Sequence, residues 1–429
     1  MWLSESNVKI NKVSKPFIIS AVVFVFAGSI IGSIWMMSLL GAEHFVFVHN
    51  SFSLHKTFQV DGFLTLLIMG IGYMIVPRFR NVQLSSSGLA YLSFTLIILS
   101  IVISTISAFS HETLLLPSNF VQFLGVSIFA GIMIWTLRIH PRLLRTADYF
   151  IGLSVVVLLF VSLFHVILAA AEIAEPSGDI GSGNGNIMSE VQMLMLFAVL
   201  MIFGVEYKTL PSFLGFIKPR RKLAMVSFGL GITSVILGIS SMLYSEFLLA
   251  ETFNVVLLGS VITFGRAVYI FGGFDNREIL RVLQDERKAR YSYIVRHLRL
   301  AFLFLFASII MAAAFNIFGT FVLYDLAVHY AAIGFLGITI ALYLPLMLPP
   351  ITGRIVHFTK FNSLPLFLII AALAIRTLGD IMMTSLQLDS INSASYAFMT
   401  SGWLVVAALF AFVTMIHRSM KQEEAINEL

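Results

Sequence analysis

The sequence predicts an all-α, polytopic membrane protein with twelve transmembrane helices in three pseudo-symmetric units of four. The first observation is compositional: 59% of the 429 residues are apolar and only 11% are charged, and the apolar residues form long runs. A run of about 20 apolar residues is long enough to cross the hydrocarbon core of a bilayer. The second observation is that Pro77, Pro211 and Pro349 are spaced 134 and 138 residues apart, each closing such a run. This spacing indicates a threefold internal repeat.

The repeat is clearest between its first two copies. The motif Gly-x-x-Tyr-x-x-x-Pro-x-Phe occurs at 70–79 and again at 204–213, whereas the third copy keeps Tyr343 and Pro349 at a different interval. We therefore expect one transmembrane domain, 1–429, containing units at 15–145, 146–297 and 298–420.

Hydropathy predicts the twelve spans in order. They are 17–40, 57–77, 87–109, 119–137, 149–171, 191–211, 223–244, 247–271, 300–322, 328–349, 364–387 and 395–417. The second span of each unit ends in its proline, which suits a helix end because no following turn needs its amide.

The loop charges predict the orientation. Basic residues occupy the N-terminus and alternate loops: Lys9, Lys12, Lys15, Arg78, Arg80, Arg138, Arg142, Arg145, Lys218, Arg220, Arg221, Lys222, 277–299, Arg354 and Lys360. The opposite loops, including the Gly/Ser-rich segment 176–185, are acidic or neutral. Because basic loops stay in the cytoplasm, we expect a multi-pass plasma-membrane protein with both termini and the charged connector 276–297 cytoplasmic.

Composition also excludes several kinds of site and partner. The chain has no cysteine, which excludes thiolate metal sites, iron–sulfur clusters and disulfides. The net charge of +5 follows from the basic loops that the orientation requires, so the predicted partner is the lipid bilayer and not a nucleic acid.

Histidine is the residue type here best suited to hold haem or a metal. Four of the ten histidines lie in or beside basic inner loops, and six lie on the outer side, where His55, His165 and His329 adjoin or enter apolar spans. Ionisable residues inside a membrane are costly and mark candidate functional sites. His165 is a candidate third ligand, with a helix–helix hydrogen bond as its structural alternative.

His55 and His329 form a pair by position. They precede Pro77 and Pro349 by 22 and 20 residues, which puts them ~33 and ~30 Å from the predicted inner ends of spans 2 and 10. Two imidazoles at one depth on symmetry-related helices can flank a planar haem b as its axial ligands. Gly62 lies on the His55 face and Gly334 follows His329, where a missing side chain leaves room for a macrocycle. The alternative is two unrelated histidines at the interface.

The run His329-Tyr-Ala-Ala-Ile-Gly334-Phe-Leu-Gly337 resembles the tenth helix of haem–copper oxidase and nitric oxide reductase catalytic subunits. The segment 55–77 resembles their second helix. The resemblance implies that both histidines ligate a low-spin haem. The chain departs from that superfamily at Ala327, where a high-spin haem ligand is expected, and in spans 6 and 7, which lack the copper-binding histidines. We therefore expect no binuclear copper centre.

Short motifs along nearly the whole chain are similar to those of the NnrS family, which is associated with haem, copper and the nitric oxide response. They are Lys-Pro-Phe at 15–17, His55, Lys-Thr-Leu-Pro-Ser-Phe at 208–213 and Ile-Thr-Gly-Arg at 351–354. Thr57, Phe58 and Ile351 replace a histidine, a glutamate and a histidine of that family, and Lys208 replaces an arginine. Of the properties that the resemblance implies, these substitutions affect chiefly the binding of copper.

Polar residues within spans offer further candidates. Arg376 and Asp380 lie at i,i+4 in span 11, either as a self-neutralising pair or with Arg376 paired to a haem propionate. Glu206 and Lys208, near the inner end of span 6, either snorkel and pair or form part of a proton path.

These observations together predict an integral membrane haem b protein without turnover of its own, acting in electron transfer or nitric oxide-related chemistry. Its partners would be an electron donor or the subunits of a complex. The alternatives are a transporter, in which intramembrane Arg376 and Asp380 line a path, and a haem-free scaffold subunit. The sequence does not distinguish nitric oxide from oxygen.

Overall fold

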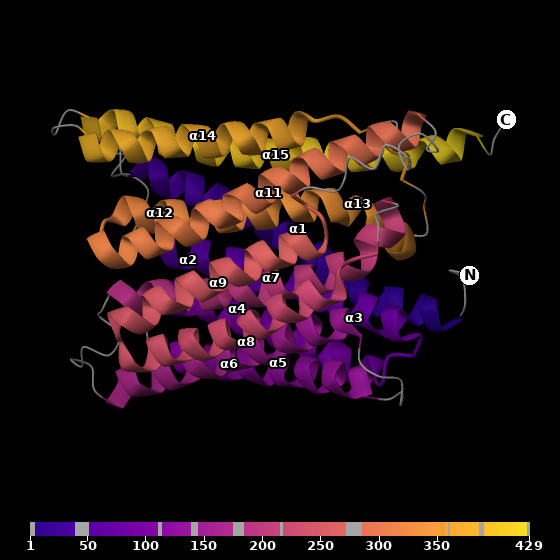
Figure 1. The fold of residues 1–429 in the computed structure, drawn as a ribbon, viewed down its shortest axis with the longest axis horizontal. Coiled ribbons are helices and arrows are strands. Elements are labelled where there is room, and N and C mark those ends of the chain that lie inside the picture. Colours follow the sequence, from indigo (N-terminus) through magenta and orange to yellow (C-terminus); the bar gives the residue numbers. More distant parts are fainter. Residues whose placement is uncertain are drawn as a thin grey trace. The chain divides into compact units, whose positions relative to one another are not determined.

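The computed structural model describes residues 5–38, 51–109, 114–138, 145–174, 184–214, 218–271, 285–352, 354, 356–358, 361–385 and 390–426. Over these residues the chain is helical and contains no strand (Figure 1). Twelve of the described helices are long and apolar enough to cross a membrane, which confirms the all-α, polytopic fold class.

The described helices follow one another along the chain. Their bounds are α1 (Glu5–Ser38), α2 (Ser51–Thr57), η1 (Phe58–Thr65), α3 (Leu66–Arg80), α4 (Ser87–Phe109), α5 (Leu115–Arg138), α6 (Thr146–Ala174), α7 (Asn184–Leu214), α8 (Arg221–Tyr244), α9 (Phe247–Ala267), α11 (Asp285–Phe318), α12 (Phe321–His329), η3 (Tyr330–Gly337), α13 (Ile338–Thr352), α14 (Leu364–Ser385) and α15 (Ser390–Ile426). The segments η1 and η3 are π-helical. Each joins its neighbours into one continuous span, Ser51–Arg80 and Phe321–Pro349.

The tenth span begins earlier than hydropathy predicts. It starts at Phe321, so His329 lies within the helix and the prediction that it marks the helix's outer end is wrong. The cause is the tight turn before it, where Gly319 adopts φ 64° and Thr320 is extended. Glycine tolerates this left-handed conformation at little cost, so only two residues separate the end of α11 from the start of α12.

The three repeat prolines lie in the last helical turn. The helices continue three residues past Pro77, Pro211 and Pro349, to Arg80, Leu214 and Thr352. Each proline lacks the N–H that would bond the carbonyl four residues earlier, so it disturbs the preceding turn and leaves the residues after it free to continue the helix.

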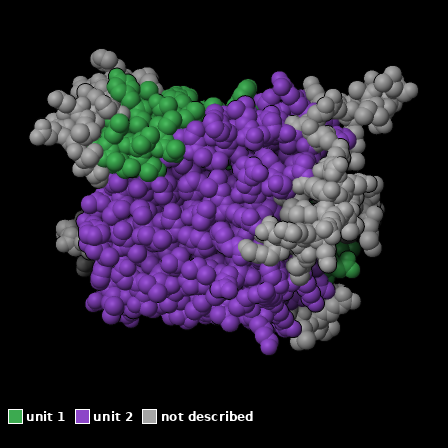
Figure 2. All heavy atoms as spheres, turned by 45° about the horizontal axis from the view of Figure 1, so that its top comes forward, with its two compact units in different colours: residues 1–143, 155–180, 374–410 green, residues 144–154, 181–373, 411–429 purple. Residues whose placement is uncertain are grey.

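The described chain divides into two compact units, coloured separately in Figure 2. The first unit contains residues 1–143, 155–180 and 374–410, and the second contains 144–154, 181–373 and 411–429. Their boundaries do not follow the sequence repeat, because α6, α14 and α15 each contribute to both.

Within the first unit, α1 packs along α2, η1 and α3, while α4 packs against α5. The motif Gly28-x-x-x-Gly32 lies on α1 where Gln59 and His55 approach it. Small residues at this spacing let helices come close inside a membrane, where burial from water no longer drives association.

Within the second unit, α8 and α9 form a closely packed pair, and α11 packs against α9, α12 and η3. Ser227 and Ser260 each donate a hydroxyl to the other's carbonyl at 2.8 Å, which ties α8 to α9. The rings of Phe203 and Phe264 stack with centroids 3.8 Å apart at the centre of this unit.

Candidate functional site

The first and third copies of the repeat, which carry the histidines, share a backbone feature that the middle copy lacks. His55 lies three residues before η1, and His329 immediately precedes η3. The corresponding helix of the middle copy, α7, is α-helical along its described length and has no histidine in its span. π-Helical turns are rare and occur frequently at functional sites.

His55 is half-buried and faces α1. Its Nδ1 atom lies 2.8 Å from the carbonyl oxygen of Gly28. A Cβ atom at Gly32 would stand 2.5 Å from the same nitrogen, so the absence of a side chain there makes room for the imidazole. One residue beyond η1's start, Gln59 donates its amide to Ser29 at 3.0 Å, which ties the segment to the same stretch of α1.

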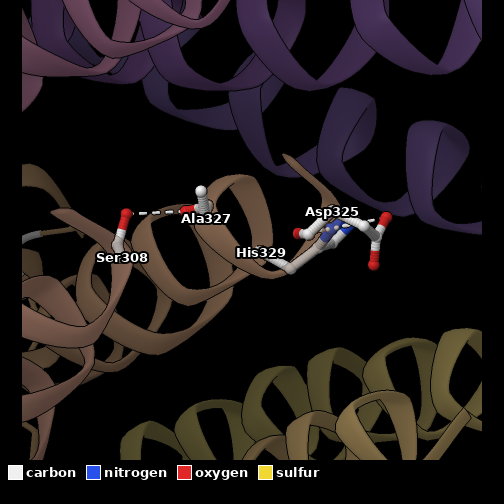
Figure 3. Close-up of polar contacts among 4 residues, drawn as sticks. All are labelled: Ser308, Asp325, Ala327 and His329. Atoms are coloured by element: carbon white, nitrogen blue, oxygen red, sulfur yellow. Dashed lines mark hydrogen bonds and ion pairs between the residues drawn. The ribbon is translucent and has the colours of Figure 1, made fainter. Parts of the chain in front are cut away.

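His329 is held by its own helix. Its Nδ1 lies 2.8 Å from the backbone oxygen of Asp325 and 3.3 Å from the Asp325 carboxylate (Figure 3). In the preceding turn, the Ser308 hydroxyl of α11 donates to the Ala327 carbonyl at 2.6 Å. These contacts fix the end of α12 at the point where the π-helical segment begins.

The bonds to carbonyl oxygens determine the tautomer of both imidazoles. A carbonyl only accepts, so Nδ1 carries a proton, and in the neutral ring this leaves the lone pair on Nε2. Histidines that bind metals commonly use this arrangement, which orients the ring. His297 makes the same 2.8 Å bond, to Tyr293 one turn back in α11, but no π-helical segment follows it. His55 and His329 are therefore distinguished from His297 by having both the Nδ1–carbonyl bond and a π-helical segment that follows, and not by the bond alone.

The glycines predicted to admit a macrocycle lie at close helix contacts. A Cβ at Gly62 would stand 2.5 Å from Phe24 of α1, and one at Gly334 would stand 2.6 Å from Phe304 of α11. Both lie inside a π-helical segment. In this structure the space beside each glycine is therefore filled by a phenylalanine of the preceding helix, and their role toward haem remains a prediction.

Arg376 and Asp380 are buried on α14 in the first unit, exposed by 7% and 0%. The Arg376 guanidinium lies 5.4 Å from the centroid of the Phe398 ring of α15. A cation over an aromatic face is stabilised by the ring's quadrupole, more so when desolvated. The structure thus places a buried cation in the same unit as His55, while its pairing to a propionate stays a prediction.

His165 belongs to a polar group that also contains Asp61, which the sequence analysis did not single out. Gln122 donates to the Asp61 carboxylate at 2.5 Å, and His165 lies within electrostatic range of that carboxylate. The backbone oxygen of His165 accepts a bond from Asn119 at 3.0 Å. The available signal was an aspartate inside the predicted span 57–77.

The structure gives each compact unit one histidine of the predicted pair, His55 to the first and His329 to the second. Ala327, at the superfamily's high-spin position, is buried and lines an apolar cavity of about 30 Å³ with Met188 and Met195. Among the described residues, no three His, Asp or Glu side chains gather as a metal site would require. His44, His49, His111 and His140 lie outside the described residues.

The supporting residues Gly28, Gly32, Ser308 and Asp325 were missed by sequence reasoning. Two of them carried a readable signal, since Gly28 and Gly32 form a small-x-x-x-small pattern in span 1. Ser308 had none, because its bond to Ala327 depends on how α11 packs on α12.

Comparison of the chain with protein-family models and with curated proteins finds no match. The resemblances to the NnrS family and to the haem–copper oxidases therefore stay predictions.

Proposed function

We propose that this chain is an integral membrane haem b protein in which His55 and His329 are the axial ligands. Its role is electron transfer or nitric oxide-related chemistry, without a binuclear copper centre and without turnover of its own. A donor protein or partner subunits would supply its electrons. The observation that carries the proposal is the pairing of histidine with a π-helical segment in two repeat copies and the absence of both from α7.

The polar residues present suit such a group, while Phe24 and Phe304 fill the space beside Gly62 and Gly334 and would have to move for the macrocycle. Each imidazole carries its lone pair on Nε2, the usual donor to haem iron, because Nδ1 is bound to a carbonyl. The Asp325 carboxylate 3.3 Å from the Nδ1 of His329 makes that imidazole a stronger ligand. Arg376 supplies a buried cation suited to a propionate. When bound, haem would provide a one-electron redox centre.

A visible spectrum tests the proposal. Protein purified from a haem-replete host should show a sharp low-spin α-band in the reduced-minus-oxidised spectrum. His55→Ala and His329→Ala should each abolish it, because a bis-histidine site needs both ligands. His297→Ala is the matched control and should keep the band. Colourless protein, or equal loss in all three variants, would contradict the proposal.

Elemental analysis tests the metal content. We expect iron and no tightly bound copper at a binuclear site, because spans 6 and 7 contain no histidine and Ala327 stands at the high-spin position. One copper per chain that is lost in His55→Ala or His329→Ala would overturn this expectation.

Cysteine labelling tests the proposed plasma-membrane orientation with cytoplasmic termini. The chain has no cysteine, so single substitutions report without background. Ser182→Cys, in a segment outside the described residues, should react with an impermeant reagent from outside the cell, and Lys218→Cys should not. The reverse pattern would invert the orientation.

A transporter is the alternative function, and one observation favours it. Irregular segments at corresponding positions of two repeats also mark transporter binding sites. The Nδ1 atoms of His55 and His329, each bound to a backbone carbonyl beside such a segment, favour haem binding instead. A colourless protein that moves a solute across reconstituted vesicles would support the transporter. A protein that binds no haem and moves no solute would support a scaffold subunit.

A further inference from the structure

Glu206 of α7 is fully buried in the second unit, with an exposed fraction of 0%. Neither of its carboxylate oxygens has a hydrogen-bond partner among the described residues. An isolated ionised carboxylate in an apolar interior costs so much solvation free energy that such a group neutralises instead. Lys208 lies two residues further on, so it projects from a different face of the helix, where it interacts with Arg145 and Asp148.

A titratable group near Glu206 is Tyr343 of α13. The Tyr343 side chain is buried and lies within electrostatic range of Glu206. Its hydroxyl also approaches the hydroxyl of Thr209, one turn along α7, without the alignment of a hydrogen bond. One turn back on α13, Thr339 carries another buried hydroxyl without a partner among the described residues. Buried polar groups are normally bonded, so this set requires a specific explanation.

The first copy of the repeat shows what a closed arrangement looks like. Tyr73, which is the counterpart of Tyr343 in the first copy, is completely buried, and its hydroxyl lies 2.8 Å from that of Ser93 on α4. Tyr343 has no such partner and faces a carboxyl instead. The unpartnered hydroxyl is therefore a local property of the third copy and not a consequence of the motif.

Burial without a partner determines the state of the carboxyl. Neither oxygen of Glu206 accepts a hydrogen bond from a described residue. Thr209 donates its proton to the Val205 carbonyl at 2.8 Å, so it has no proton left for a neighbour. A carboxyl that no donor or cation compensates is stable in an apolar interior only in its neutral form, which has a hydrogen to donate.

We propose that Glu206 is a proton-binding site in the second unit, a neutral carboxyl that donates to the neighbouring Tyr343 hydroxyl through one water molecule. The ligand is a proton. The site lies near the Pro211 end of α7, which the loop charges predict to face the cytoplasm. The proposal uses none of the haem-binding residues, so it stands or fails separately from the proposed function.

Labelling with a hydrophobic carbodiimide tests the site in the full-length protein. Such reagents add across a protonated carboxyl in apolar surroundings, and peptide mass spectrometry locates the adduct. We expect the adduct on Glu206, its loss in Glu206→Gln, and less labelling as alkaline pH removes the proton. Asp148, which accepts the Arg145 amide at 2.8 Å, should stay unlabelled. Intact protein without the adduct would overturn the proposal, and so would protection by sodium or potassium chloride at constant pH, which would indicate a metal-cation site.

Infrared spectroscopy provides an independent readout. The protein should show the carbonyl stretch of a neutral carboxyl, and Glu206→Gln should remove it while preserving the fold. Tyr343→Phe should move the band to higher frequency, because the carboxyl loses its partner. Tyr73→Phe is the matched control and should leave the band unchanged. A neutral-carboxyl band that persists at full intensity in Glu206→Gln would overturn the assignment.

Discussion

The second helices of the three repeat copies end alike and differ in the middle. Each continues three residues past its proline, to Arg80, Leu214 and Thr352. Only the first and third contain a histidine and a π-helical segment. Tyr73 and Tyr343 are buried, whereas their counterpart Tyr207 is only half-buried.

The difference in burial follows how much of each helix its neighbours cover. Every residue from Leu64 to Pro77 of the first copy is buried, so Tyr73 is covered whichever way it points. In α7, Glu206 is buried while Tyr207 and Lys208 are half-buried, so one side of this end is less covered. The comparison teaches that the repeat preserves the helix end, while the neighbouring helices determine which side chains that end buries.

Shifting the register across the π-helical segments should break the comparison most severely. A π-helical turn already absorbs one extra residue, so inserting one alanine after Val60 of η1, or after Ala332 of η3, should rotate the histidine by about 100° relative to the proline end. We expect complete loss of the haem α-band with little change in helical content by circular dichroism. Insertion variants that retain the full band would show that the π-helical segments do not position the ligands.

Substitutions at Arg376 and Asp380 on α14 test whether the first unit contributes a cation to the proposed haem site. Arg376→Leu should lose haem or shift its midpoint potential while the protein still inserts, because a buried propionate would lose its cation. Asp380→Asn should change the spectrum less. A purely structural pair predicts equal destabilisation by both substitutions, on the order of 3–5 kcal/mol, because either change leaves a buried charge uncompensated. Thermal unfolding followed beside the visible spectrum separates these outcomes.

The glycines inside the π-helical segments should be intolerant of a side chain. Gly62→Ala and Gly334→Ala place a Cβ against Phe24 and Phe304, and overpacking of this kind costs about 1–3 kcal/mol. Gly131→Ala, with nothing within 4 Å of the added atom, should leave the melting temperature nearly unchanged. Melting curves that do not distinguish the three variants would mean that α1 and α11 move aside easily.

The smallest effect is expected at the contact that fixes the His329 turn. Ser308→Ala removes the 2.6 Å bond to the Ala327 carbonyl and should destabilise the protein by about 0.5–1.5 kcal/mol. The haem band should broaden or shift slightly, because the imidazole loses support one turn away. Ser162→Ala, whose hydroxyl bonds only within its own helix, serves as the control. A larger spectral change in the control would contradict a positioning role for Ser308.

Most of the span boundaries could be predicted from hydropathy. The predicted span 87–109 coincides with α4 (Ser87–Phe109), and 223–244 differs from α8 by two residues. The start of the tenth span was missed because the turn at Gly319 and Thr320 is too short to interrupt an apolar run. Hydropathy averages over a window and does not resolve a two-residue turn between two membrane helices.

The sequence by itself determined the twelve spans, the repeat of the prolines and the histidines that two copies carry. These follow from composition and spacing, because a bilayer requires long apolar helices whatever their packing. Only the tertiary structure decided that η1 and η3 are π-helical, that Nδ1 of His55 faces Gly28, and that Glu206 faces Tyr343. An extra residue in a helical turn leaves the hydropathy of the span unchanged. Its presence depends on how closely neighbouring helices approach, and that approach brings together residues far apart in the sequence.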